Sequence, residues 1–170
     1  DTLIDIVIST YYYGSNLYVA TNTGSGFYTQ SIAGIKCEDF ELIDFDFDND
    51  MDIIAIDFDE DSLYWYENLG NLQFDRHTLG YKYRLQGIDP VDWDSDGDID
   101  IIYNTGYSGF TNGSIYENGI YRNDGNGVMT PEIWHSNLTM SKPMKVVDYE
   151  NDGDYDVTVS YTHLTLPTIY

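Results

Sequence analysis

The chain has 170 residues, with 30 acidic residues against 7 lysines and arginines and a formal net charge of −23 at pH 7. Such a charge excludes nucleic acid as a partner, because phosphates would be repelled, and disfavours anionic membrane surfaces. Hydrophobic residues make up 42% and aromatic residues 16% of the chain, which argues for a packed fold and against a disordered acidic tail. No apolar stretch is long enough to span a bilayer.

The opening segment LIDIVIST, residues 3–10, belongs to a repeated unit. This segment matches the end of a longer motif found twice more, and Asp5 stands where Asp52 stands 47 residues later (52 − 5). Short apolar and aromatic segments, NLYVATN and FYTQSIA, follow it and end in Gly and Asn turns. Residues 1–35 are therefore expected to form the last three strands of a unit.

Residues 36–80 form the first complete unit. It contains the acidic segment DFDFDNDMDII from Asp44, then SLYWYEN and FDRHTL. In SLYWYEN, Leu63 and Trp65 share one strand face while Tyr64 and Tyr66 share the other. A strand that is apolar on both faces is expected to lie inside stacked sheets.

Residues 81–140 form a second complete unit, with DWDSDGDIDII from Asp92 and an insertion near GYSGFTNG. Residues 141–160 begin the next unit, with DYENDGDYDVT from Asp148. Residues 161–170 have neither acids nor repeat character. They resemble translated sequencing-adapter read-through, which would make them a non-native tail, and the alternative is an ordinary strand and loop.

The spacing of the acidic segments indicates the fold class. Their starts are 48 and 56 residues apart (92 − 44 and 148 − 92), and each unit holds four short strand-like segments without a helical stripe. Four strands per unit at such a period are typical of a β-propeller blade. We expect an all-β fragment of a larger propeller, built from four-stranded antiparallel blades that continue into further blades of the same chain.

The acidic segments follow the pattern D-x-[DE]-x-D-[GN]-D-x-D, with a carboxylate at every second residue. Calcium takes six to eight hard oxygen ligands, and a tight loop of this kind can direct several carboxylates inward. Position 6 is Asn49, Gly97 or Gly153, residue types that tolerate a positive φ. The pattern predicts about one Ca²⁺ per complete loop, with Mg²⁺ as the weaker candidate and an ion-free acidic turn as the alternative.

An EF-hand also begins with D-x-D-x-D-G, but it needs a bidentate Glu at position 12 and flanking helices. Position 12 is Ala55, Tyr103 or Val159, each within an expected strand. The EF-hand alternative therefore fails in all three copies.

The loops together with LYWYENLGNLQFDRHTL resemble the FG-GAP/VCBS repeat family, whose blades are similar to those of the integrin α-subunit propeller. The resemblance extends to about Ser160, although the Phe-Gly motif that names the family is missing. It implies a calcium-binding loop between the first and second strands of each blade, with position 7 ligating through its main-chain carbonyl. The implied side-chain ligands are Asp44, Asp46, Asp48 and Asp52; Asp92, Asp94, Asp96 and Asp100; and Asp148, Glu150, Asp152 and Asp156. The implied main-chain ligands are Asp50, Asp98 and Asp154.

Two functions are compatible with these features. The first is a non-catalytic, secreted or cell-surface module that scaffolds adhesion to, or binding of, an extracellular protein or carbohydrate. The alternative is the propeller domain of a secreted, calcium-dependent polysaccharide lyase or hydrolase. The first is preferred because the paired carboxylates belong to the metal loops, and because His77, His135 and His163 are isolated residues expected at the surface.

Overall fold

The computed structural model describes residues 3–11, 14–106, 117–125, 128–136 and 141–160. Within these residues the chain forms thirteen β-strands and no helix, so no helix here is long and apolar enough to cross a membrane. The strands are β1 (Ile6–Thr10), β2 (Asn16–Asn22), β3 (Phe27–Ala33), β4 (Cys37–Ile43), β5 (Asp52–Asp57), β6 (Ser62–Asn68), β7 (Phe74–Tyr81), β8 (Leu85–Val91), β9 (Asp100–Thr105), β10 (Glu117–Asn123), β11 (Met129–Ser136), β12 (Ser141–Val147) and β13 (Asp156–Ser160).

The strands form four antiparallel sheets in chain order. Strands β4 to β7 make one four-stranded sheet and β8 to β11 make another, each with its strands in sequential order. Strands β1 to β3 form a three-stranded sheet, and β12 and β13 form a pair. Each four-stranded sheet is therefore a meander, in which strands that are consecutive in the sequence are also neighbours in the sheet, as in a propeller blade.

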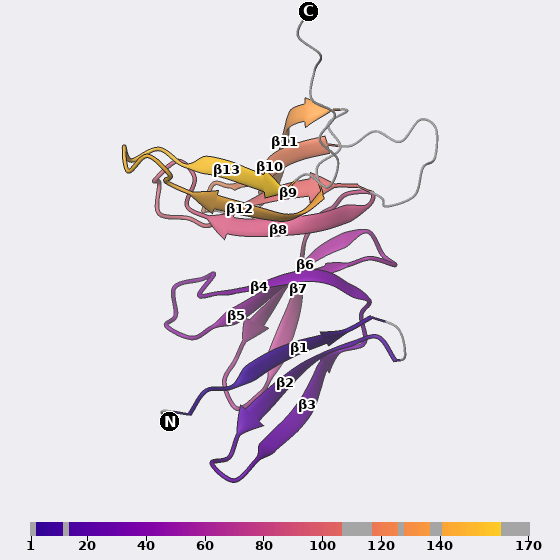
Figure 1. Ribbon diagram of the computed structural model, residues 1–170. Helices are drawn as coiled ribbons and strands as arrows, with labels where there is room; N and C mark the ends of the chain where they lie inside the picture. The colour runs from indigo at the N-terminus through magenta and orange to yellow at the C-terminus, as the bar shows by residue number, and fades with distance from the viewer. Residues whose placement is uncertain (1–2, 12–13, 107–116, 126–127, 137–140, 161–170) are drawn as a thin grey trace, which may run out of the picture.

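The sheets are stacked side by side, with β1–β3 at one end and β12–β13 at the other (Figure 1). The first strands of successive sheets contact one another: β4 lies against β8, and β8 lies against β12. This shared inner edge identifies the sheets as consecutive blades of a β-propeller fragment, which confirms the predicted fold class.

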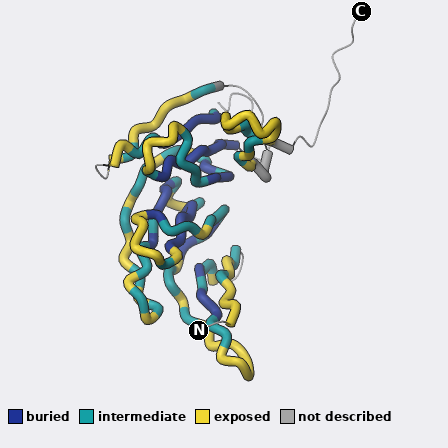
Figure 2. The backbone as a smooth tube through the Cα atoms, turned by 90° about the vertical axis from the view of Figure 1, so that its left-hand side faces the viewer, coloured by how far each residue is buried: buried dark blue, intermediate teal, exposed yellow. Residues whose placement is uncertain are grey.

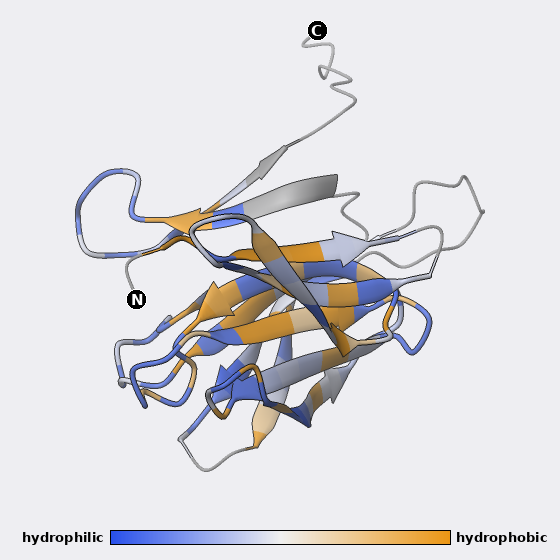
Figure 3. Cartoon of the chain, turned by 90° about the horizontal axis from the view of Figure 1, so that it is seen from below, coloured by the Kyte–Doolittle hydropathy of each residue, from blue (hydrophilic) through white to orange (hydrophobic). Residues whose placement is uncertain are grey.

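The second strands carry the core. Every residue of β5 and of β9 is buried, and buried residues run through the middles of the stacked sheets (Figure 2). Hydrophobic residues concentrate in the strands, whereas the connecting loops are hydrophilic (Figure 3). Because a blade between two neighbours is covered on both faces, these strands have consecutive apolar residues, and each buried Ile contributes on the order of 2 kcal/mol.

The two faces of β6 confirm the expected stacking. Leu63 and Trp65 pack in the cluster between the β4–β7 and β8–β11 sheets. Tyr64 and Tyr66 pack on the opposite side, against the β1–β3 sheet. Cys37, at the start of β4, is a buried thiol whose Sγ–H donates to the Asp39 carbonyl oxygen at 3.4 Å.

The inner edges of the blades are joined by carboxylates. The Ile88 N–H of β8 donates to Asp39 Oδ2 of β4 at 3.2 Å. One blade further on, the Val146 N–H of β12 donates to Asp89 Oδ2 of β8. Lys145 Nζ bonds both Asp89 and Glu41. These contacts use backbone donors that an edge strand would otherwise leave unpaired.

One buried pair differs between the two four-stranded sheets. In the first, Ile56 of β5 lies opposite Leu63 of β6. In the second, the same place holds Asn104 opposite Asn118, which are 0% and 5% exposed. Neither side-chain amide has a hydrogen-bond partner in the part of the chain that the structure describes. A polar pair therefore replaces an apolar one inside the stack.

Candidate metal-binding loops

Three Asp-rich loops join the first and second strands of successive sheets: β4 to β5, β8 to β9, and β12 to β13. All three project from the same side of the stack (Figure 1). We call them the first loop (residues 44–52), the second loop (92–100) and the third loop (148–156). Their placement follows from the meander, because every first-to-second-strand connection lies at the same end of its blade.

The backbone repeats one unusual conformation in each loop. Position 6 has a positive φ in all three, at Asn49 (76°), Gly97 (98°) and Gly153 (97°), as the sequence predicts. Position 4 also has a positive φ in all three loops, at Phe47 (62°), Ser95 (61°) and Asn151 (54°). Sequence reasoning missed position 4, because a bulky Phe is seldom found in this region and hides the shared pattern.

Side-chain carboxylates stabilise this conformation from within. In the first loop the Asn49 N–H donates to Asp44 Oδ2 at 3.1 Å, and the Asp50 N–H donates to Asp48 Oδ1 at 3.0 Å. The position 6 to position 1 bond recurs at 3.1 Å in the second loop and 3.0 Å in the third. The position 7 to position 5 bond recurs at 3.0 and 3.1 Å. Three sequences with different intervening residues thus adopt one hydrogen-bonded turn.

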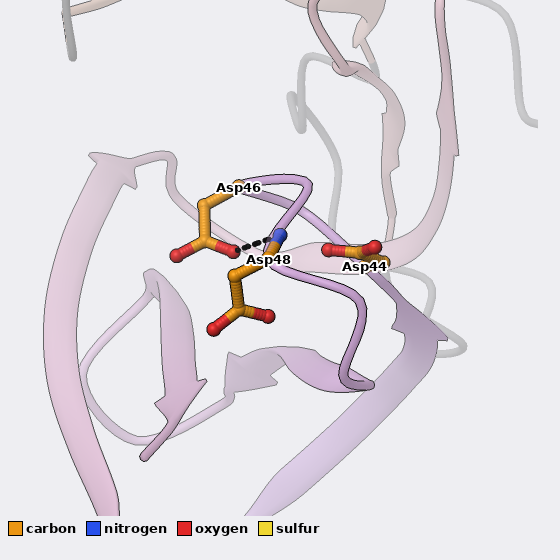
Figure 4. Close-up of side chains that lie close together, drawn as sticks. All are labelled: Asp44, Asp46 and Asp48. Carbon is orange, nitrogen blue, oxygen red and sulfur yellow. Dashed lines mark hydrogen bonds between the residues drawn. The ribbon is translucent and has the colours of Figure 1, made fainter.

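The turn brings the carboxylates of positions 1, 3 and 5 together in the first two loops. Ligand oxygens of Asp44, Asp46 and Asp48 lie within 4.8 Å of one another (Figure 4). Those of Asp92, Asp94 and Asp96 do the same. The third loop shares the backbone bonds, but its acids do not form such a group among the described residues. At position 3 the third loop has Glu150, whose side chain is one methylene longer than the Asp of the other two loops.

Two oxygens of the first loop fit a hard cation. Asp44 Oδ1 and Asp50 Oδ1 are buried and have no hydrogen-bond partner in the described chain. Burial, and then repulsion from neighbouring aspartates, raises the pKa of Asp50. The pKa of Asp46 is raised for the same reasons, although the Asp48 N–H that donates to it acts in the opposite direction. An anionic group that is desolvated and lacks donors is stabilised by a bound cation.

Position 9 has a further role that sequence reasoning missed. Asp52 is 1% exposed, and its two oxygens accept the Phe45 N–H at 3.2 Å and the Asn68 N–H at 2.7 Å. Asp100 accepts the Trp93 and Asn123 N–H groups at 3.1 and 2.8 Å. Asp156 accepts the Tyr149 N–H at 3.2 Å, and Asp5 accepts the Asn22 N–H at 2.7 Å.

We call this aspartate the brace, because it ties the start of the loop to the end of the third strand. Burial raises the pKa of Asp100, an effect that the two donated N–H groups oppose. The sequence signal that could have revealed the brace is the Asn that closes each third strand: Asn22, Asn68 and Asn123. The metal-ligand role implied for Asp52, Asp100 and Asp156 stays a prediction beside this structural role.

Comparison with known families agrees with this geometry. Residues 44–103 match the family model of the FG-GAP-like repeat. This stretch of the chain is similar to an FG-GAP-like repeat. The matched stretch begins at position 1 of the first loop and ends in β9, so it includes both loops with converged carboxylates. A search of curated proteins found no match.

The two four-stranded sheets, β4–β7 and β8–β11, differ beside their Asp-rich loops. Arg122 of β10 bonds Asp94 Oδ2 through Nη1 at 3.0 Å and lies 3.7 Å from the brace Asp100. The corresponding residue of β6 is Glu67, one position before Asn68 as Arg122 is one position before Asn123. Glu67 bonds His77 Nε2 at 2.7 Å. The second loop therefore has a positively charged side chain, the guanidinium of Arg122, beside its carboxylates.

His77 corrects an expectation. It is not isolated, because its ring stacks on Trp65 with centroids 4.5 Å apart and its Nε2 contacts Glu67. The ring lies at a cavity of about 670 Å³ between the two four-stranded sheets. Phe45, Phe47, Trp65 and Met129 line that cavity together with Asp46 and Asp98 of the first two loops. The sequence places His77 and Glu67 ten residues apart on adjacent strands, so only strand register brings them together.

The position 7 side chains differ between the first two loops. The Asp98 carboxylate lies against Gly125, where a Cβ would be 2.4 Å from Asp98 Oδ2. In the first loop, the Oδ1 atom of Asp50 is buried and has no hydrogen-bond partner among the described residues. The predicted main-chain ligation by Asp50, Asp98 and Asp154 remains a prediction. Several expectations fall outside the described residues: the insertion near GYSGFTNG beyond Gly106, His163 with the tail 161–170, and the side chain of His135.

Proposed function

We propose that this chain is a calcium-binding, non-catalytic β-propeller module. The observation that carries the proposal is the repeated loop geometry, with two carboxylate triads whose oxygens lie within 4.8 Å. The partnerless buried oxygens of Asp44 and Asp50 support it. FG-GAP-like repeats are in general non-catalytic modules, and the match over residues 44–103 supports that part of the proposal.

Oxygen donors alone make up these sites, which suits a hard divalent cation. In the first loop, the side chains of Asp44, Asp46 and Asp48 would hold the ion, with Asp50 and Asp52 as further donors. Calcium suits such a site better than magnesium, because magnesium rarely uses a site made only of protein groups. When bound, the ion supplies positive charge that offsets the repulsion between carboxylates and fixes the turn between two strands.

We further propose that the module works outside the cell or at the cell surface and presents its loops to a protein or carbohydrate partner. Calcium is millimolar there and matches the affinity of extracellular modules, on the order of 10⁻⁴ to 10⁻³ M. The net charge of −23 favours a partner that is not strongly anionic. The cavity between the two four-stranded sheets, with aromatic side chains beside the first loop, is a concave surface that suits such contact.

Thermal unfolding tests the calcium proposal. At about 2 mM calcium and a dissociation constant of roughly 10⁻⁴ M, each occupied site adds about 2 kcal/mol to the free energy of unfolding. The midpoint should rise by several degrees in calcium relative to EDTA, and by less in magnesium. The double variant Asp44→Asn, Asp92→Asn should lose most of the rise, whereas Asp75→Asn, an exposed acid on β7, should keep it. An equal midpoint in calcium and EDTA would reject the proposal.

A further inference from the structure

The first and second loops share one backbone turn but differ in the charge that adjoins them. Both have a triad at positions 1, 3 and 5 and a brace at position 9. Beside the second loop stands Arg122, whereas the corresponding strand position next to the first loop is Glu67. The difference between these two residues is two charge units at equivalent places in neighbouring blades.

Arg122 is directed at the ligands themselves. Its Nη1 bonds Asp94 Oδ2 at 3.0 Å and approaches Asp100 Oδ2 to 3.7 Å, while its Nε lies 3.7 Å from Glu132. The Arg122 side chain is 24% exposed, and its guanidinium lies close to three carboxylates, two of them in the second loop. Glu67, in contrast, is engaged by His77 at 2.7 Å.

We infer that Arg122 is a built-in competitor for the cation of the second loop, so that the two loops load at different calcium concentrations. This inference rests on the calcium proposal above. A guanidinium bonded to a ligand carboxylate lies roughly 5 Å from an ion on that carboxylate, since calcium–oxygen distances are about 2.4 Å. At that distance in a water-like dielectric, its charge weakens binding of a divalent ion about tenfold.

The consequence is a graded response to calcium. The first loop fills first and fixes its blade, and the second fills only when calcium displaces the charge of Arg122 from Asp94. The chain thereby senses two ranges of calcium concentration with two loops of the same sequence pattern. A partner that contacts the cavity would meet Asp98 of the second loop in either state.

Calorimetric titration of calcium into variants of this chain that keep one intact loop tests this inference. Asp92→Asn with Asp148→Asn leaves the first loop, and Asp44→Asn with Asp148→Asn leaves the second. The first-loop protein should bind about tenfold more tightly. Adding Arg122→Gln to the second-loop protein should remove most of that difference, whereas Arg122→Lys should keep it.

Arg84→Gln is the matched control, because it removes the same charge from a guanidinium that lies over the Tyr83 ring at 5.0 Å. Arg84 stands just before β8, whereas the second loop follows the other end of that strand. This control should leave second-loop affinity unchanged. Circular dichroism on each variant establishes that it is folded. Unchanged or weaker binding after Arg122→Gln overturns the inference, since it would show that Arg122 orients Asp94 for the ion. If no protein in the series binds calcium, the calcium proposal itself fails, and that outcome is distinct.

Discussion

Replacing the brace aspartate of the first loop separates structural from metal-binding roles. Asp52 is buried, and its two oxygens accept two backbone N–H groups, from Phe45 and Asn68. In Asp52→Asn one oxygen is replaced by an NH₂ group that faces a backbone donor. A hydrogen bond to a charged acceptor contributes about 1.5–3 kcal/mol, so the variant should lose about 2 kcal/mol of unfolding free energy. For a domain of this size, that lowers the midpoint by roughly 4–8 °C.

The assay is thermal unfolding followed by circular dichroism, in EDTA and in calcium. Asp52→Asn should be destabilised in both, because the brace bonds exist without an ion. The matched control is Asp46→Asn, an exposed triad residue whose Oδ1 accepts the Asp48 N–H at 3.2 Å and can still do so as an amide. That control should lose stability only in calcium. An Asp52→Asn protein as stable as the parent in EDTA would refute the brace and leave Asp52 as a ligand alone.

Further tests address pH, the buried amide pair and a crowded glycine. The pKa values of Asp46 and Asp50 are raised in the folded protein, so their protonation favours folding, and this stability is lost as pH rises through the folded pKa. In EDTA, the contribution of these two groups to the unfolding free energy should therefore fall as the pH rises above about 4, the ordinary pKa of an aspartate, whereas in calcium the unfolding free energy should rise. Denaturant titrations at successive pH values check both, and a rise in EDTA would contradict the raised pKa values. Replacing Asn104 and Asn118 together by Leu removes partnerless buried amides and should stabilise the protein by about 2 kcal/mol in urea unfolding, while a loss would show that the pair has a polar partner. Gly119→Ala places a Cβ 2.1 Å from the Glu132 carbonyl oxygen, so it should lower the midpoint strongly. The Cβ of Gly97→Ala meets no atom within 4 Å, so only the backbone strain of its φ of 98° acts, and the loss should be about 1–3 kcal/mol.

The loop conformation was only partly accessible from sequence. Alternating acids and the Asn or Gly at position 6 predicted a tight turn, and Asn49, Gly97 and Gly153 do have positive φ. Position 4 escaped notice because a residue's backbone region is set by the whole hydrogen-bonded turn. Phe47 adopts the same region as Ser95 although its own preference is against it.

The side-chain environment of the site was not accessible. Arg122 and Asp94 are 28 residues apart, and they meet because β10 runs antiparallel to β9 and ends beside the second loop. His77 and Glu67 meet through the register of β6 and β7. No local pattern encodes either pair, since each depends on where two strands stop relative to one another.

The sequence by itself determined the repeat period, the number of strands per unit and the three Asp-rich loops. These features are periodic and local, because strand alternation and turn chemistry depend on neighbouring residues. Tertiary structure alone decided which carboxylate oxygens converge and which serve the backbone. It also decided that Asp52 and Asp100 brace their blades and that Arg122 adjoins only the second loop. Burial and distance between separate strands set these roles, and both exist only once the blades are stacked.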